Sequence, residues 1–126
     1  MATVLVVDDE FGIAELLEAL LMDDGHRVLT AANGREALER MVEAQPDLVI
    51  SDLMMPVMDG AGLLHALRDR TEWHDIPFML MCALPEEDVR WQLTGDYQGF
   101  LRKPFRMDDV VRVVDRLLAA HGAGKA

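Results

Sequence analysis

Short apolar runs alternate along the chain with longer segments whose apolar positions recur every three or four residues. The short runs predict strands at residues 4–7, 27–31, 48–51, 77–81 and 99–102, and the first and third of them are rich in β-branched residues. The longer segments between them predict amphipathic helices. Five strand–helix repeats, with strands apolar on both faces, predict a parallel sheet that is covered by helices on each side.

The predicted helices have recognisable ends. The first is expected to end at Gly25, a residue suited to the left-handed position after a helix. The second is expected to begin at Asn33, with Glu36 completing a capping-box-like arrangement, and to bury Ala37, Leu38, Met41 and Val42. The remaining helices are expected at about residues 59–69, 86–93 and 106–120.

Composition narrows the class of protein. The chain has 126 residues, of which 51% are hydrophobic, and therefore predicts one globular domain. Its formal net charge of −11 argues against a nucleic-acid or anionic-membrane surface. No apolar run approaches the roughly 20 residues of a membrane span. A single cysteine, Cys82, excludes an internal disulfide and favours a cytoplasmic location.

Acidic residues follow two of the predicted strands. Asp8 and Asp9 come directly after the first strand, and Asp52 comes after the third. The carboxyl ends of parallel strands are where such sheets bind ligands, so these side chains are expected to meet there, with Cys82 and Lys103 beside them. Carboxylates crowded into one pocket repel one another, and a hard cation such as Mg²⁺ makes such a pocket tolerable. Asp52 is then a candidate carboxylate nucleophile.

The chain resembles the receiver domain of bacterial two-component response regulators, including the chemotaxis regulators. The resemblance covers Val4 to about Leu118 and depends on the pair Asp8-Asp9, the segment from Asp52 to Gly60 and the run Lys103-Pro104-Phe105. Receiver domains take a phosphoryl group on an aspartate and are signalling modules, so no enzymatic activity is expected beyond self-phosphotransfer and autodephosphorylation.

The resemblance implies a flavodoxin-like (βα)₅ fold, doubly wound, with strand order 2-1-3-4-5. It assigns residues 1–120 to the receiver and leaves 121–126 as a flexible tail. It implies phosphotransfer from a histidine kinase or a histidine phosphotransfer protein onto Asp52. Mg²⁺ would be held by Asp9, Asp52 and the main-chain carbonyl of Met54, with Asp8 contributing through water.

Two features depart from the family pattern. Cys82 stands where receivers usually have a Thr or Ser that moves with the phosphoryl group, and a thiol is a weaker hydrogen-bond donor. The segment from Cys82 to Lys103 is also about one residue shorter than usual. Phe100 matches the aromatic switch residue of the family. The phosphorylation chemistry should survive these changes, whereas the conformational switch is expected to be weaker.

Several alternatives stay open. An interaction-only pseudo-receiver is the main alternative to a phosphoacceptor, while a flavin carrier or a phosphatase lacks its characteristic loop residues. Trp91 either completes the core or belongs, with the last helix, to a face for a downstream target or a second copy of the chain. The four histidines follow no metal-ligand spacing and receive no ligand role: His26, His65, His74 and His121.

Overall fold

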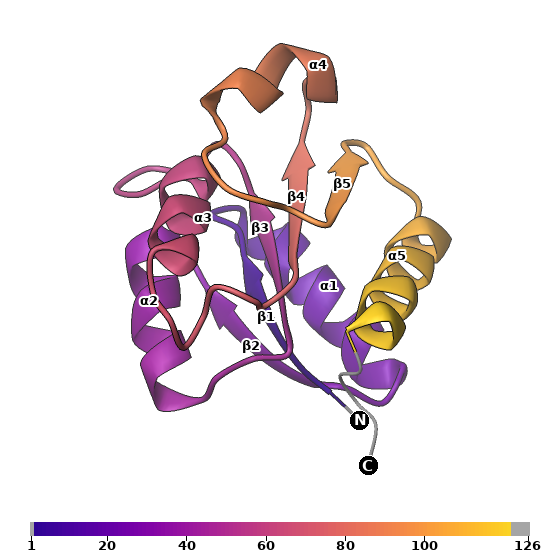
Figure 1. Cartoon of the computed structure of the whole chain (residues 1–126). Coiled ribbons are helices and arrows are strands. Elements are labelled where there is room, and N and C mark those ends of the chain that lie inside the picture. The colour runs from indigo at the N-terminus through magenta and orange to yellow at the C-terminus, as the bar shows by residue number, and fades with distance from the viewer. Residues whose placement is uncertain (1, 122–126) are drawn as a thin grey trace.

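A computed structural model of the chain describes residues 2–121. One parallel sheet runs through the molecule in the order β2-β1-β3-β4-β5 (Figure 1). The strands are β1 (Thr3–Val7), β2 (Arg27–Ala31), β3 (Leu48–Asp52), β4 (Phe78–Cys82) and β5 (Gly99–Arg102). The predicted fold class and strand order are confirmed, because this is the doubly wound order of flavodoxin-like domains.

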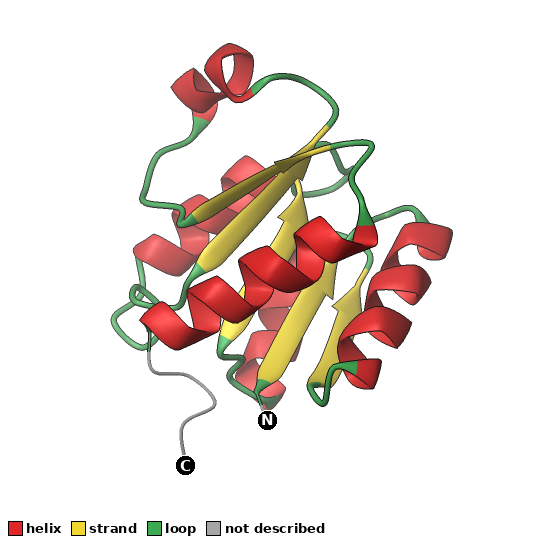
Figure 2. Cartoon of the chain, turned by 90° about the vertical axis from the view of Figure 1, so that its right-hand side faces the viewer, coloured by secondary structure: helices red, strands yellow, loops and turns green. Residues whose placement is uncertain are grey.

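Helices cover both faces of the sheet (Figures 1 and 2). Their bounds are α1 (Phe11–Asp23), α2 (Gly34–Glu43), α3 (Gly60–Arg68), α4 (Glu86–Val89), the 3₁₀ turn η1 (Arg90–Gln92) and α5 (Met107–Ala120). The helix expected over residues 86–93 is therefore four α-helical residues and a 3₁₀ turn. Of the predicted tail, His121 caps α5, and residues 122–126 lie outside the described residues.

Each face of the sheet has its own apolar core. Side chains of α1 and α5, such as Leu17, Leu21 and Val114, pack with Val4 and Ile50 on one face. Side chains of α2, α3 and α4 pack on the other. The first core packs one face of the sheet against α1 and α5. The second core includes residues of the loop that follows β3, next to the acidic strand ends.

The helix signals in the sequence correspond to real contacts. Gly25 follows α1 with a φ of 93°, in the left-handed region that favours glycine. Asn33 accepts a hydrogen bond from the Glu36 N–H at 2.9 Å, and the Glu36 carboxylate accepts one from Ala32 N–H at 3.2 Å. The prediction for Val42 was wrong: its side chain is 73% exposed, because it lies one position beyond the buried stripe of α2.

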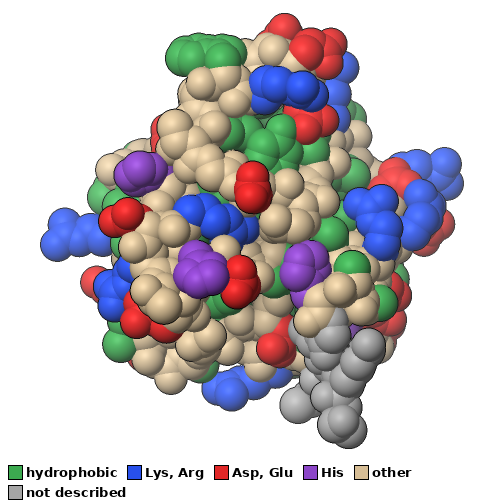
Figure 3. Space-filling view, in the orientation of Figure 1, with side chains coloured by type: hydrophobic (Ala, Val, Ile, Leu, Met, Phe, Trp, Pro, Cys, Tyr) green, Lys and Arg blue, Asp and Glu red, His purple; other side chains and the backbone are tan. Residues whose placement is uncertain are grey.

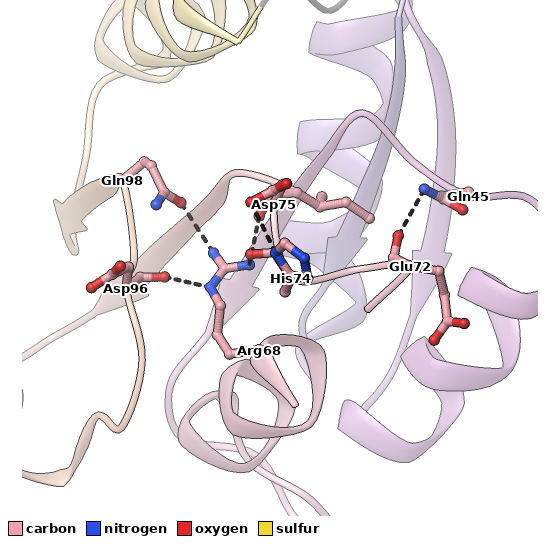
Figure 4. A network of polar contacts seen from close by, with 8 residues as sticks. Gln45, Arg68, Glu72, His74, Asp75, Asp96 and Gln98 are labelled. Atoms are coloured by element: carbon pink, nitrogen blue, oxygen red, sulfur yellow. Dashed lines mark hydrogen bonds and ion pairs between the residues drawn. The ribbon is translucent and has the colours of Figure 1, made fainter. Parts of the chain in front are cut away.

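Arg68, the last residue of α3, contacts the segments that lead into β4 and β5 (Figure 4). Its guanidinium donates to the carbonyls of Asp96, His74 and Ile76 at 2.8, 3.1 and 2.9 Å. It also donates to the side-chain oxygen of Gln98 at 3.1 Å. Arg68 thus ties the end of α3 to the segment that precedes β4 and to the segment that precedes β5. None of the helices in the described part of the chain is long and apolar enough to cross a membrane.

Candidate functional site

Three strand ends bring the site residues to one edge of the sheet. Asp8 comes directly after β1, Asp52 ends β3, and Lys103 comes directly after β5. The two aspartates are buried, with exposed fractions of 2% for Asp8 and 6% for Asp52. A parallel sheet therefore gathers side chains that are up to 95 positions apart in the sequence.

The ammonium group of Lys103 lies among the carboxylates. Its Nζ donates to Asp8 Oδ2 at 3.2 Å and lies 3.4 Å from Asp52 Oδ2 and 3.7 Å from Glu10 Oε1. The other Asp8 oxygen accepts the Glu10 N–H at 2.9 Å. Lys103 is itself held by its backbone N–H, which donates to the Cys82 carbonyl at 2.8 Å. The cation is thus placed to neutralise the pocket in part.

Glu10 also joins the pocket, although it was not among the site residues predicted from the sequence. One oxygen each of Asp8, Glu10 and Asp52 lies within 4.8 Å of the others. Glu10 has extended backbone, with φ −86° and ψ 102°, so residues 8 and 10 continue the two-residue alternation of the strand. This alternation was the signal in the sequence that could have identified Glu10. Asp9 is exposed and lines a hollow with Asp8 and Phe11, and its role as a direct metal ligand stays a prediction.

Burial and mutual repulsion raise the pKa values of the carboxyl groups in the pocket. Burial, and then the charge of Asp8, raises the pKa of Asp52 to about 6, although Lys103 opposes this. Burial likewise raises the pKa of Asp8. For Lys103, burial lowers the pKa, but the carboxylates of Asp52, Asp8 and Glu10 outweigh it and raise the pKa overall. The pocket holds more negative than positive charge, and its all-oxygen donors suit a hard cation such as Mg²⁺.

The loop after β3 holds Asp52 in place. Leu53 donates its N–H to the Met81 carbonyl at 2.9 Å and accepts the Gly60 N–H at 2.8 Å. Asp59 caps α3 by accepting the Gly62 N–H at 2.8 Å. A β-carbon on Gly60 would collide with the Asp52 carbonyl oxygen and lie 2.9 Å from Leu53 Cα. The loop therefore closes against the backbone of the nucleophile candidate itself.

The two candidate switch residues differ in burial. Cys82 ends β4 and is buried, and its sulfur accepts the Leu84 N–H at 3.4 Å. Phe100 lies in β5, half-buried against the core beneath α3 and α4. Both lie on strands next to the acidic pocket. Their part in a conformational switch stays a prediction.

Trp91 does not complete the core, because its side chain is 78% exposed. Its indole N–H donates to the Asp88 carbonyl at 2.9 Å. With Met54, Met55 and Leu84 it lines a groove of about 560 Å³ formed by the loops after β3 and β4 and by the α4 region. Hydrophobic surface is visible over this region in Figure 3. The lining of this groove does not include residues of α5.

The sequence matches the family described as the response regulator receiver domain over residues 4–115. The chain belongs to this family. It is thus a receiver domain of two-component signalling, a class of phosphoacceptor modules that interact with histidine kinases and typically bind Mg²⁺ in an acidic pocket. The flavin-carrier and phosphatase alternatives are thereby excluded.

The curated relatives are longer than this chain. The chain is 39% identical over 124 residues to the sensor histidine kinase TmoS of Ectopseudomonas mendocina, covering 98% of this chain and 13% of that protein. It is 37% identical over 124 residues to the response regulator Rre1 of Synechocystis, covering 96% and 53%. The chain therefore spans about half, or less, of the curated relatives that it matches.

Solved structures support the same assignment. The chemotaxis response regulator CheY4 of Vibrio cholerae superimposes with a TM-score of 0.86 at 34% identity, covering 94% of this chain and 99% of that chain. The receiver domain of a signal transduction histidine kinase from Syntrophus aciditrophicus gives a TM-score of 0.88 at 32% identity, covering 100% and 95%.

Proposed function

We propose that Asp52 accepts a phosphoryl group from a histidine kinase or a histidine phosphotransfer protein in a Mg²⁺-dependent reaction. The observation that carries this proposal is the buried pair of Asp8 and Asp52 with the Lys103 ammonium between them. A nucleophile, a charged pocket and a nearby cation are the elements that phosphoryl transfer onto a carboxylate needs.

In the proposed step, a carboxylate oxygen of Asp52 attacks the phosphorus of the phosphohistidine. The new P–O bond forms as the P–N bond breaks, and the electron pair of that bond returns to the leaving imidazole. Lys103 changes its ion-pair partner: it pairs with Asp52 before the transfer and with a phosphoryl oxygen afterwards. Its distance of 3.4 Å from Asp52 Oδ2 suits that exchange of partners.

The residues proposed to hold Mg²⁺ are Asp9, Asp52 and the main-chain carbonyl of Met54, with Asp8 acting through water. Glu10 adds a further carboxylate within reach of Asp8 and Asp52. When bound, Mg²⁺ offsets the charge of the transferring oxygens. Methionine at position 54 is no obstacle, because only its carbonyl is used and its side chain is exposed.

A protein donor would find apolar surface beside the pocket. Ile13, Leu16 and Phe105 line a groove of about 400 Å³ that also includes Glu10 and Lys103. Helices of a phosphodonor protein could bury this surface while presenting a histidine to Asp52. We place this encounter in the cytoplasm, where kinase and receiver would meet.

The output of the domain is proposed to depend on Cys82 and Phe100. Cys82 would follow the phosphoryl group with its weak S–H donor, and Phe100 would report the change through ring burial. The downstream target is proposed to use the exposed face of Trp91 and the last helix, with homodimer formation as the alternative use of that face.

Acetyl phosphate and Mg²⁺ test this function without the unknown kinase. We expect a slower-migrating species on a phosphate-affinity gel that is lost in Asp52→Asn and on chelation with EDTA. Asp69→Asn is the matched control, because Asp69 is an exposed aspartate outside the pocket. An unshifted wild-type protein with acetyl phosphate and other small phosphodonors would favour the phosphorylation-independent pseudo-receiver.

A further inference from the structure

A second group of potential metal ligands lies at the opposite edge of the sheet from Asp52. Asp24 caps the end of α1, His26 directly precedes β2, and Asp115 lies on α5. Because His26 precedes a strand and Asp52 ends one, about one strand length, on the order of 15 Å, separates this group from the acidic pocket. The turn between α1 and β2 thus contributes Asp24 and His26, and α5, distant in the sequence, contributes Asp115.

The imidazole of His26 is aimed between the two carboxylates. Its Nε2 lies 3.4 Å from Asp24 Oδ2 and 3.9 Å from Asp115 Oδ1. The His26 side chain is only 11% exposed. Among the side chains of residues 2–121, its Nε2 is the one buried nitrogen or oxygen atom that makes no hydrogen bond. A buried nitrogen without a partner, facing two carboxylates, requires an explanation.

We propose that Asp24, His26 and Asp115 bind a divalent transition-metal ion of the Zn²⁺ class. Zinc–nitrogen and zinc–oxygen bonds of about 2.0–2.2 Å at tetrahedral angles separate neighbouring ligand atoms by roughly 3.3–3.5 Å. The three ligand atoms here lie within 4.8 Å of one another, so small side-chain movements complete the site. Imidazole with two carboxylates suits zinc, and water would fill the fourth position.

The surroundings of the three side chains favour a cation, and the site is accessible from solvent. Asp24 and Asp115 are 35% and 57% exposed, so an ion reaches them from solvent and meets the buried nitrogen behind them. Desolvation, and then repulsion from Asp24, raises the pKa of Asp115. A bound cation would relieve that repulsion.

One hydrogen bond of His26 opposes metal binding and limits the affinity for the ion. The Ala2 N–H donates to His26 Nδ1 at 3.3 Å, which favours the tautomer with the proton on Nε2. Metal on Nε2 moves that proton to Nδ1 and gives up this long hydrogen bond. The cost of one such bond is small beside three metal–ligand bonds. The ion would then tie the turn between α1 and β2 to α5.

The test uses the Asp52→Asn protein, in which the acidic pocket has lost its central carboxylate. Titration calorimetry with ZnCl₂, and absorption spectroscopy with CoCl₂, should show one ion per chain and Co²⁺ d–d bands. Adding His26→Gln or Asp115→Asn should weaken the affinity at least tenfold. His74→Gln is the matched control, because His74 also contacts an aspartate, Asp75, at 2.9 Å but is exposed.

Each outcome decides the proposal. Affinity that falls in both site variants, stays within twofold in the control and survives excess MgCl₂ supports the site. Absence of Zn²⁺ binding in Asp52→Asn, or equal affinity in Asp115→Asn and the control, would overturn it. Asp115 is exposed on a helix, so its variant keeps the test valid even where His26→Gln lowers stability.

Discussion

The carboxyl group of Asp52 is nearly removed from water, and its pKa of about 6 has a consequence for stability. Between the unfolded value of 3.8 and about 6, the folded protein binds more protons than the unfolded chain. The metal-free fold therefore loses stability as the pH rises from about 4 through 6. At pH 7 this unfavourable contribution is on the order of 2–3 kcal/mol.

Asp52→Asn should remove that contribution. Urea denaturation in EDTA should find the variant about 2 kcal/mol more stable than the wild type at pH 7, with the difference vanishing near pH 4. Asp8 and Glu10 remain as partners for Lys103, so its charge stays compensated. A variant no more stable than the wild type at pH 7 would show that Asp52 ionises without penalty.

Val57 has a strained backbone in the loop after β3. Its φ is 71°, in the left-handed region, and β-branched residues are rare there. Val57→Asn should stabilise the fold by about 1 kcal/mol, measured by urea denaturation, because Asn tolerates this conformation. Val42→Asn is the control: Val42 is as exposed as Val57 but lies in α2, where the same change should be close to neutral. Equal effects at both positions would contradict the strain argument.

At the residue scale, the sequence predicts groups that strand ends force together. Asp8, Asp52 and Lys103 were found because each directly ends or follows an apolar run. Glu10 was missed because the apolar run of β1 ends at Val7, so the strand alternation was not followed as far as residue 10. The juxtaposition of His26 with Asp115 has no signal in the sequence, because 89 positions separate them and only the packing of α5 on α1 brings them together.

At the element scale, α3 must begin against the end of β3. Gly60→Ala would place its new methyl group against the Asp52 carbonyl and Leu53 Cα, both of which are backbone. We expect a loss of about 1–3 kcal/mol in the free energy of unfolding, together with slower phosphorylation by acetyl phosphate. Gly12→Ala, in the open part of α1, should instead gain up to about 1 kcal/mol. Wild-type stability and phosphorylation rate in Gly60→Ala would mean that the loop is not held as described.

Arg68 links α3 to the segments before β4 and β5 (Figure 4). Arg68→Met leaves three backbone carbonyls and Gln98 without their charged donor, and should cost about 2–4 kcal/mol by thermal or urea unfolding. Arg70→Met, which removes an exposed ion pair with Glu72, should cost less than about 1 kcal/mol. Similar losses in the two variants would show that Arg68 is an ordinary surface arginine.

Most strands and helices could be predicted from the sequence, but the extent of α4 could not. Strand positions follow from apolar runs, and the start of α2 follows from Asn33 and Glu36. The residues after Glu86 favour a helix locally, but Gly95 and Asp96 are held against Arg68. The chain must therefore turn back after Gln92. That restraint comes from α3, so the local pattern could not reveal it.

At the scale of the whole molecule, the loops after the strands form the acidic pocket and two apolar grooves, one of which shares Glu10 and Lys103 with the pocket. The acidic pocket lies at one edge of the sheet, the apolar groove of Ile13 and Phe105 adjoins it, and the groove of Trp91 lies over the α4 region. Acidic and basic side chains are interspersed on the face shown in Figure 3. The formal net charge of −11 disfavours contact with nucleic acid.

The most direct measurement is a crystal structure of the protein with Mg²⁺ and beryllofluoride, a mimic of the phosphoryl group. The account predicts beryllofluoride on an Asp52 oxygen, Mg²⁺ coordinated by Asp52 and its acidic neighbours, and Lys103 Nζ bonded to fluoride. An Asp52 carboxylate that stays unmodified at saturating beryllofluoride and Mg²⁺, with Lys103 still paired to it, would contradict the account.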